Sequence, residues 1–175
     1  MFNNQVLFLT VCMFLFTGFC PQMPLHLNQV QDQEGVFTDS EKNKLEIQLK
    51  AYSNRQHFFV SVVTTENIAP YKNILSYAAN LGNQPEYEKT EVVIAISKKR
   101  RLIAIATSRR LEKILTDSIC KQVLDSVFIP HFKKDEYFTG VYNGVKSLLI
   151  HRNRINKKNQ AVLHVENQII NSSRI

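Results

Sequence analysis

The sequence contains few cysteines, histidines and glycines, and this scarcity excludes several classes of protein. Cys12 and Cys20 lie in the apolar N-terminus, so if that segment is removed only Cys120 remains and no internal disulfide can form. The five histidines show no metal-ligand spacing, and the cysteines cannot complete a zinc site. The sequence has no P-loop, no dinucleotide fingerprint and no nucleophile elbow. Familiar nucleophilic enzymes are therefore disfavoured, and Cys120 is predicted to be a buried structural residue because no arginine follows it in a phosphate-cradling loop.

Acidic residues are fewer than basic ones, 15 against 22, which gives a formal net charge of +7. Residues 151–175 carry five of the basic residues and one acid, so they contribute +4 of this excess. A nucleic-acid-binding domain would place its cations on a structured face among aromatic or base-reading side chains. We therefore predict a solvated, flexible basic tail rather than nucleic-acid binding, with contact to anionic lipid as a further alternative.

The N-terminus resembles a targeting segment. Residues 6–19 carry no charge, and this run suits the apolar region of a signal peptide better than a full membrane span of about 20 residues. We assign residues 1–20 to a signal peptide or membrane anchor and residues 21–29 to a linker. The chain is expected to be exported, to the periplasm or to the extracytoplasmic side of a membrane. Whether the leader is cleaved, retained or lipidated at Cys20 stays open.

The remaining length suits one domain, over residues 30–150. Thr38 and Glu41 form a capping box that predicts a helix beginning there, with Leu45, Leu49 and Tyr52 on its apolar face. Pro70 is predicted to start a second helix that ends near Gly82. The other expected elements are strands at 57–65, 92–97 and 102–107, a short helical turn at 110–115, a helix that Asp117 caps and Pro130 ends, and a last helix from about 135.

The order of these elements predicts an α/β fold. A helix between the first two strands permits a parallel pair, whereas the short turn at 98–101 makes an antiparallel hairpin. We expect a mixed β-sheet of about four strands flanked by helices, in a three-layer αβα sandwich.

Four motifs in this order resemble the TPM domain, a family named for thylakoid-lumen, phosphatase and receptor-modulator members. They are V-x-D-x-x-G-V-F-T at 30–38, the strand hairpin, L-E-x-x-L-T-D at 111–117 and I-P-x-F-x-x-x-x-Y-x-x-G at 129–140. Two departures stand out. Ser108, Arg109 and Arg110 replace the glycine-rich turn that members usually carry before L-E, and Lys89-Thr90 stands where many members have Asn-Gly. Because glycine tolerates positive φ and close approach of a ligand, any site in that loop is altered here.

The resemblance implies phosphatase activity for some members, and it selects candidate residues. Four acids at motif positions could hold Ca²⁺ or Mg²⁺ through oxygen ligands, namely Asp32, Glu112, Asp117 and Glu136. Arg109 or Arg110 could pair with a phosphate. Structural roles compete with these assignments: Asp117 suits a helix N-cap, Glu112 and Glu136 suit the first turn of a helix, Asp32 suits an Asx turn before Gly35, and the two arginines suit an exposed loop.

Two hypotheses about function follow. The first is a membrane-proximal module that binds another envelope or membrane protein, or assists its assembly, without robust catalysis. The alternative is an acid phosphatase that depends on a divalent metal. The position of the four carboxylates distinguishes them, because a shared Ca²⁺ requires oxygens about 2.3–2.6 Å from the ion.

Overall fold

A computed structural model describes residues 28–172, which form an α/β domain around a mixed four-stranded sheet. The strands lie side by side in sequence order; β1 pairs parallel with β2, β2 parallel with β3, and β3 antiparallel with β4. Their bounds are β1 Val30–Asp32, β2 Val60–Thr64, β3 Val92–Ser97 and β4 Leu102–Thr107. The predicted fold class is confirmed, and the hairpin strands have the predicted bounds.

Strand β1 is the element that the sequence patterns missed. Its three residues are too few to show the period-two alternation of a strand. The structure holds it through pairing with β2 and through Val30, whose N–H donates to the Glu46 carboxylate at 2.7 Å.

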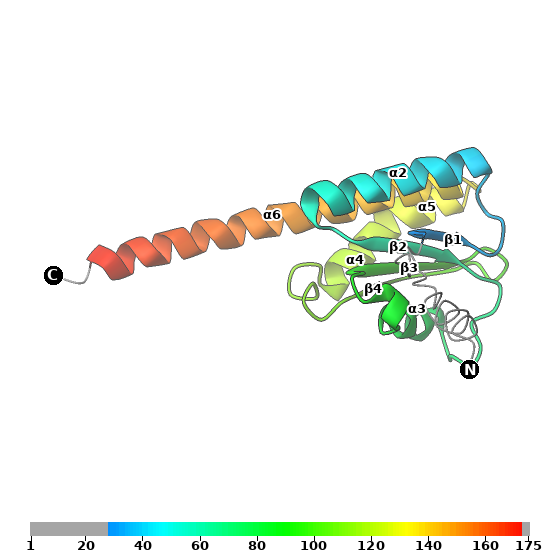
Figure 1. Cartoon of the computed structure of the whole chain (residues 1–175), viewed down its shortest axis with the longest axis horizontal. Coiled ribbons are helices and arrows are strands. Elements are labelled where there is room, and N and C mark those ends of the chain that lie inside the picture. Colours follow the sequence, from blue (N-terminus) through cyan, green and yellow to red (C-terminus); the bar gives the residue numbers. More distant parts are fainter. Residues whose placement is uncertain (1–27, 173–175) are drawn as a thin grey trace, which may run out of the picture.

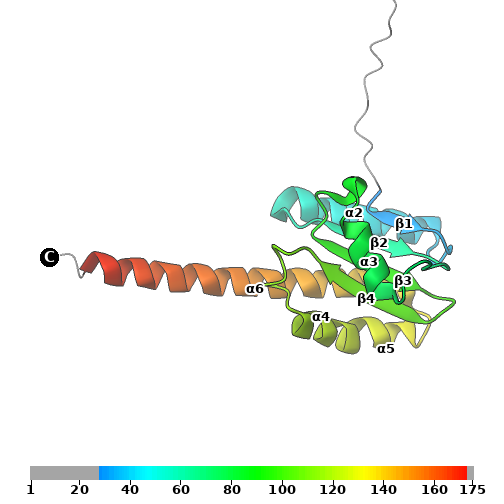
Figure 2. The ribbon, with the colours of Figure 1, turned by 90° about the horizontal axis from the view of Figure 1, so that it is seen from below.

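Helices cover both faces of the sheet, as Figures 1 and 2 show. One face carries α2 (Asp39–Gln56), α4 (Asp117–Val123) and α6 (Tyr137–Ser172) over the larger apolar core. The other face carries α3 (Ile74–Gly82) and the short 3₁₀ turn η1 (Pro85–Tyr87) over a smaller core. Burial explains the strand composition, because every residue of β2 and β3 is buried.

Helix α2 begins as predicted. The Thr38 hydroxyl accepts from the Glu41 N–H, and the Glu41 carboxylate accepts from the Thr38 N–H at 2.9 Å. Leu45 and Leu49 are fully buried, as their spacing predicted. The helix ends at Gln56, and His57, with φ 49°, forms its left-handed C-cap rather than the start of a strand.

Both helix boundaries predicted from prolines are wrong. Pro70 lies in the loop before α3, and Asn73 caps that helix by accepting from the Ser76 N–H at 2.8 Å. Pro130 does not end a helix: the chain stays helical from α4 through the π-helical turn η2 (Leu124–Phe128) into α5 (Ile129–Phe132). In the π turn the Ile129 N–H donates to the Leu124 carbonyl, five residues back. This wider turn accommodates the ring of Pro130, whose nitrogen has no hydrogen to donate.

Helix α6 differs from the flexible tail expected after Ile150, because it continues to Ser172 and projects beyond the sheet (Figures 1 and 2). Arg152 fastens it to the domain. The guanidinium donates to the Gln56 and His57 carbonyls, which α2 leaves free at its C-terminus, and lies 5.3 Å from the Phe58 ring centroid. Part of the predicted tail is thus an integral piece of the fold.

Candidate functional site

Asp32 stabilises the turn between β1 and α2. Its carboxylate accepts from the Val36 and Phe37 N–H groups at 2.9 Å and from the Thr64 hydroxyl. Gly35, at φ +62°, lets the chain turn back toward the carboxylate. The V-x-D-x-x-G-V-F-T motif therefore has a structural explanation, in which three donors already occupy the aspartate.

Glu34, which the sequence patterns did not single out, has a similar role at the same end of the sheet. Its carboxylate accepts from the Lys98 N–H at 2.7 Å, the Lys99 N–H at 3.4 Å and the Ser97 hydroxyl at 3.3 Å. It thereby ties the β1–α2 turn to the β3–β4 turn. Its only sequence signal is its position next to the glycine of the first motif.

The four predicted metal ligands divide between the two ends of the sheet. Asp32 pairs with Thr64, the last residue of β2, whereas β4 ends at Thr107 beside the strand starts Val60 and Val92. Because β2 spans about 13 Å at 3.3 Å per residue, the loop after β4 lies far from the end of β1, where Asp32 is (Figure 1). That loop carries Glu112, which is exposed, and it leads to Asp117 in the first turn of α4.

Glu136 lies just before α6, and its carboxylate is 2.7 Å from His131 Nδ1. This hydrogen bond lowers the pKa of Glu136 below its ordinary value. The adjacent Tyr137 ring stacks under the Lys98 ammonium at 5.1 Å, which places Glu136 toward the Asp32 end. The structure therefore does not bring the four carboxylates together. Among the described residues, no group of three or more His, Cys, Asp or Glu side chains could hold a metal ion.

The two departures from the TPM pattern lie against each other at the opposite end. Arg110 donates to the Glu91 carboxylate at 2.7 Å, and the Ser108 N–H bonds the Glu91 carbonyl at 2.8 Å. Glu91 directly follows Lys89-Thr90 and is buried, whereas Arg110 and Arg109 are exposed. A pocket of about 340 Å³ opens here, lined by Phe59, Glu88, Lys89, Thr90, Glu91, Ser108 and Arg110.

This pocket has no excess of positive charge, because Glu88 and Glu91 balance Lys89 and Arg110 among its lining residues. Arg110 is already paired, and the second oxygen of Glu91 and the Ser108 hydroxyl are buried without a hydrogen-bond partner. A buried carboxylate repels phosphate, so the predicted role of Arg110 in phosphate binding competes with its ion pair. The sequence signal for this arrangement is an acid, Glu91, immediately before the β-branched run of β3.

Cys120 has the predicted structural role. It is buried on α4, and its thiol points toward the Leu115 carbonyl at 3.8 Å. Burial raises its pKa to about 11, and the nearby Asp117 acts in the same direction. A thiol with this pKa is protonated at neutral pH and is a poor nucleophile.

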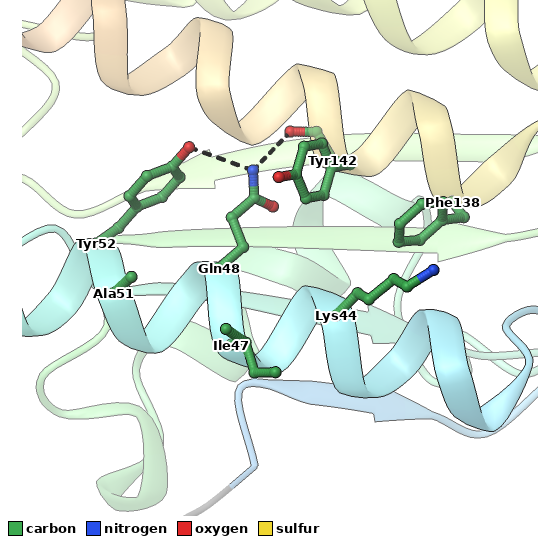
Figure 3. A pocket seen from close by; sticks show the side chains of 7 residues that line it. All are labelled: Lys44, Ile47, Gln48, Ala51, Tyr52, Phe138 and Tyr142. Atoms are coloured by element: carbon green, nitrogen blue, oxygen red, sulfur yellow. Dashed lines mark hydrogen bonds between the residues drawn. The ribbon is translucent and has the colours of Figure 1, made fainter.

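An apolar groove of about 460 Å³ runs between α2 and α6, on the side away from the sheet (Figure 3). Its walls are Lys44, Ile47, Gln48, Ala51, Tyr52, Phe138 and Tyr142. Ile47 is 60% exposed and Tyr142 38% exposed. The sequence patterns missed this surface. A signal was present, because Ile47 lies off the apolar face of the helix that Leu45 and Leu49 define, and an isoleucine at such a position is expected to be exposed.

Gln48 bridges the two helices at the floor of the groove. Its Nε2 donates to the Tyr142 carbonyl at 3.0 Å and to the Tyr52 hydroxyl at 3.2 Å (Figure 3). A second bridge, from Asn153 Nδ2 to Gln56 Oε1 at 2.8 Å, joins the same helices near the end of α2. Two side-chain hydrogen bonds thus join α2 to α6. Within residues 28–172, no helix is long and apolar enough to cross a membrane.

The sheet order and the helices on both faces define an α/β sandwich domain, and the comparisons identify its family. The model of the TPM domain matches residues 30–149, and the chain belongs to this family. The match confirms the resemblance seen in the four motifs. A search of curated proteins finds no match.

Two solved structures share the fold. The N-terminal domain of a protein from P. gingivalis superposes with a TM-score of 0.61 at 18% identity, over 75% of this chain and 83% of that domain. The N-terminal domain of the cg2496 protein from Corynebacterium glutamicum gives 0.55 at 10% identity, over 75% and 82%. At these identities the likeness concerns the fold alone.

Proposed function

We propose that this TPM-domain protein is exported, is held near a membrane, and binds another envelope or membrane protein or assists its assembly, without robust catalysis. The open groove between α2 and α6 is the observation that carries the proposal. Its walls expose Ile47 and Tyr142 to solvent, so the apolar surface of these side chains is not removed from water within the domain. Apolar surface of this kind, framed by polar residues, is typical of a binding surface.

The distribution of the acids supports a role without robust catalysis. Metal-dependent hydrolysis requires ligands that surround one ion. Here Asp32 and Glu136 lie toward one end of the sheet, and Glu112 and Asp117 toward the other. Three protein donors already occupy the Asp32 carboxylate.

Export and membrane proximity rest on sequence alone. The uncharged run at 6–19 lies outside the described residues, and it supports a signal peptide or an anchor. On the projecting part of α6, Arg154, Lys157 and Lys158 are exposed cations that support contact with anionic lipid.

Fractionation and affinity purification of the tagged full chain from the cells that produce it test the proposal. We expect the chain in the membrane fraction, accessible to protease from outside, and in stoichiometric complex with a membrane protein. A chain lacking residues 1–20 should stay in the cytosol. A cytosolic wild-type chain without a stoichiometric partner would refute the proposal.

A phosphatase assay with p-nitrophenyl phosphate tests the absence of robust catalysis. The full chain is assayed with Ca²⁺, with Mg²⁺ and with chelator, beside its Asp117→Asn variant. We expect the same background rate in every sample. Metal-dependent turnover that Asp117→Asn abolishes would establish the alternative, a divalent-metal-dependent phosphatase.

Vesicle flotation tests the lipid contact. Removal of residues 154–175 keeps Arg152 and Asn153, which hold α6 against α2, and removes the projecting cations. We expect the full chain to float with phosphatidylglycerol vesicles and the shortened chain to bind less. Equal binding would exclude the basic tail as the lipid contact.

A further inference from the structure

The floor of the α2/α6 groove holds an unsatisfied hydrogen-bond acceptor. Gln48 is only 7% exposed, and its Oε1 is buried without a partner. The Tyr142 carbonyl can only accept, so it fixes the amide with Nε2 toward α6 and prevents exchange of the oxygen and nitrogen positions. A buried acceptor that bonds neither protein nor solvent costs about 1–3 kcal/mol. Because the protein encloses this oxygen, Gln48 belongs to the bridge between the helices, and recognition of an occupant falls to the exposed wall residues.

The groove walls define the rest of the occupant. Six of the seven lining residues are uncharged, and Lys44 is the single charged one, with no carboxylate among them. The occupant therefore needs large apolar side chains and one acid that reaches Lys44. The projecting half of α6 from a second copy of the chain does not meet this requirement. Its exposed charges, Arg154, Lys157 and Lys158, are basic and would be repelled by Lys44.

The polar groups of the groove favour a helix over an extended peptide. An extended segment would bring an N–H and a C=O from each residue into a groove whose lining offers few polar partners. A helix satisfies the hydrogen bonds of its own backbone and needs none from the groove. Two neighbouring helices also present a groove into which the ridge of a third helix fits.

We infer that the groove between α2 and α6 receives one amphipathic helix of the partner protein. Its apolar side chains pack between Ile47 and Tyr142, and an aspartate or glutamate pairs with Lys44. The inference rests on the proposed function and names the surface and the partner chemistry that serve it.

Photo-crosslinking in the producing cells tests the inference with the full chain. p-Benzoylphenylalanine is placed at Ile47, at Tyr142 and, as a matched control, at Leu75. Leu75 is a 53% exposed apolar residue of α3, on the opposite face of the sheet. We expect positions 47 and 142 to label the same segment of one protein, with helical apolar periodicity and an acidic residue, at about tenfold higher yield than position 75.

Charge reversal tests the role of Lys44. Lys44→Glu should lower the yield at position 47 by about tenfold, because attraction becomes repulsion. Lys72→Glu is the control, since Lys72 is an exposed cation before α3. Replacement of the labelled partner acid by lysine should restore crosslinking to the Lys44→Glu chain.

Four results would overturn the inference: equal yield at position 75, adducts with a second copy of this chain, adducts with lipid, or a labelled segment without an acid. If the chain still purifies with a membrane protein in any of these cases, the proposed function stands and only the surface is wrong. If no partner purifies, the proposed function itself fails.

Discussion

The Arg110 guanidinium lies 2.7 Å from the buried carboxylate of Glu91 and joins the two segments in which this chain departs from the TPM pattern. Glu91 follows Lys89-Thr90, and Arg110 ends the Ser-Arg-Arg turn that replaces glycine. The two departures therefore form one unit, in which an ion pair stands at a place where glycines usually give a flexible turn.

Arg110→Ala should lower the free energy of unfolding by about 1–3 kcal/mol, because it leaves the Glu91 carboxylate buried without its cation. Urea denaturation followed by circular dichroism measures the loss. Arg109→Ala, at the exposed neighbour, should change stability by less than about 0.5 kcal/mol. Adding Glu91→Gln to Arg110→Ala should recover part of the loss, since the buried charge is then removed. Equal effects of the two arginine variants would contradict the ion-pair role.

Asp32→Ala should lower the free energy of unfolding by about 2–4 kcal/mol, because the Val36 and Phe37 N–H groups and the Thr64 hydroxyl lose their acceptor. Denaturation with calcium and with chelator measures whether the loss depends on metal. We expect the same loss in both. An Asp32→Ala effect seen only with calcium would show that the aspartate is a metal ligand, and exposed Glu112→Ala is the control.

Gly144→Ala should destabilise the protein by at least about 1–3 kcal/mol through overpacking. A Cβ at Gly144 would lie 2.1 Å from Cζ of Phe128, which is fully buried. Gly82→Ala is a matched control in α3, where the new Cβ would make an ordinary 3.5 Å contact with Val93. Thermal melting should show a large loss for Gly144→Ala alone, with partial rescue by Phe128→Leu. Equal melting temperatures would contradict this close packing.

Cys120 should resist thiol reagents at neutral pH until the protein unfolds, because burial raises its pKa to about 11. Reaction of Ellman's reagent with residues 24–175, which contain no other cysteine, measures the rate. The raised pKa means that the thiol of the folded state keeps its proton to a higher pH than the thiol of the unfolded state, whose pKa is about 8.5. The stability from this group is therefore complete below about pH 8.5 and is lost as pH rises toward about 11.

Cys120→Ala should remove this alkaline loss of stability and flatten the slope between these pH values. Lys121→Ala, at the exposed neighbour, should leave the slope unchanged. Fast labelling of the native wild-type thiol at neutral pH would contradict the prediction.

His131→Ala should raise the pKa of Glu136 toward its ordinary value, because the hydrogen bond from His131 is the largest cause of its lowering. Carboxyl carbon chemical shifts recorded against pH by NMR measure the change. The lowered pKa means that the contribution of Glu136 to stability is present above about pH 4.3, the ordinary glutamate value, and is lost as pH falls through the lowered value. Lys134→Ala should produce a smaller shift, and a larger one would refute the His131 assignment.

The candidate site was only partly predictable from sequence. Asp32, Glu112, Asp117 and Glu136 occur at family motif positions, but motif order does not tell which end of a sheet a loop occupies. That depends on whether the preceding strand runs parallel or antiparallel to its neighbour, and β4 runs opposite to β1. The groove was invisible because it depends on the distance between α2 and α6, whose contacting residues Gln48 and Tyr142 are 94 positions apart.

Local chemistry allowed the sequence to determine much of the fold. The capping box at Thr38, the spacing of Leu45 and Leu49, and the β-branched runs of β3 and β4 act over a few residues, and each produced the expected element. Tertiary contacts decided the rest. Pairing with β2 makes a strand of Val30–Asp32, a π turn carries the helix through Pro130, and Arg152 anchors α6 to the end of α2.

The two departures from the TPM pattern also separate what the sequence determines from what the fold decides. The sequence revealed that glycines are missing from two separate segments, but only the folded chain places Glu91 beside Arg110, because pairing of β3 with β4 brings their ends together. Sequence patterns report interactions among near neighbours, whereas an ion pair across 19 residues or a groove between two helices requires the whole sheet to form first.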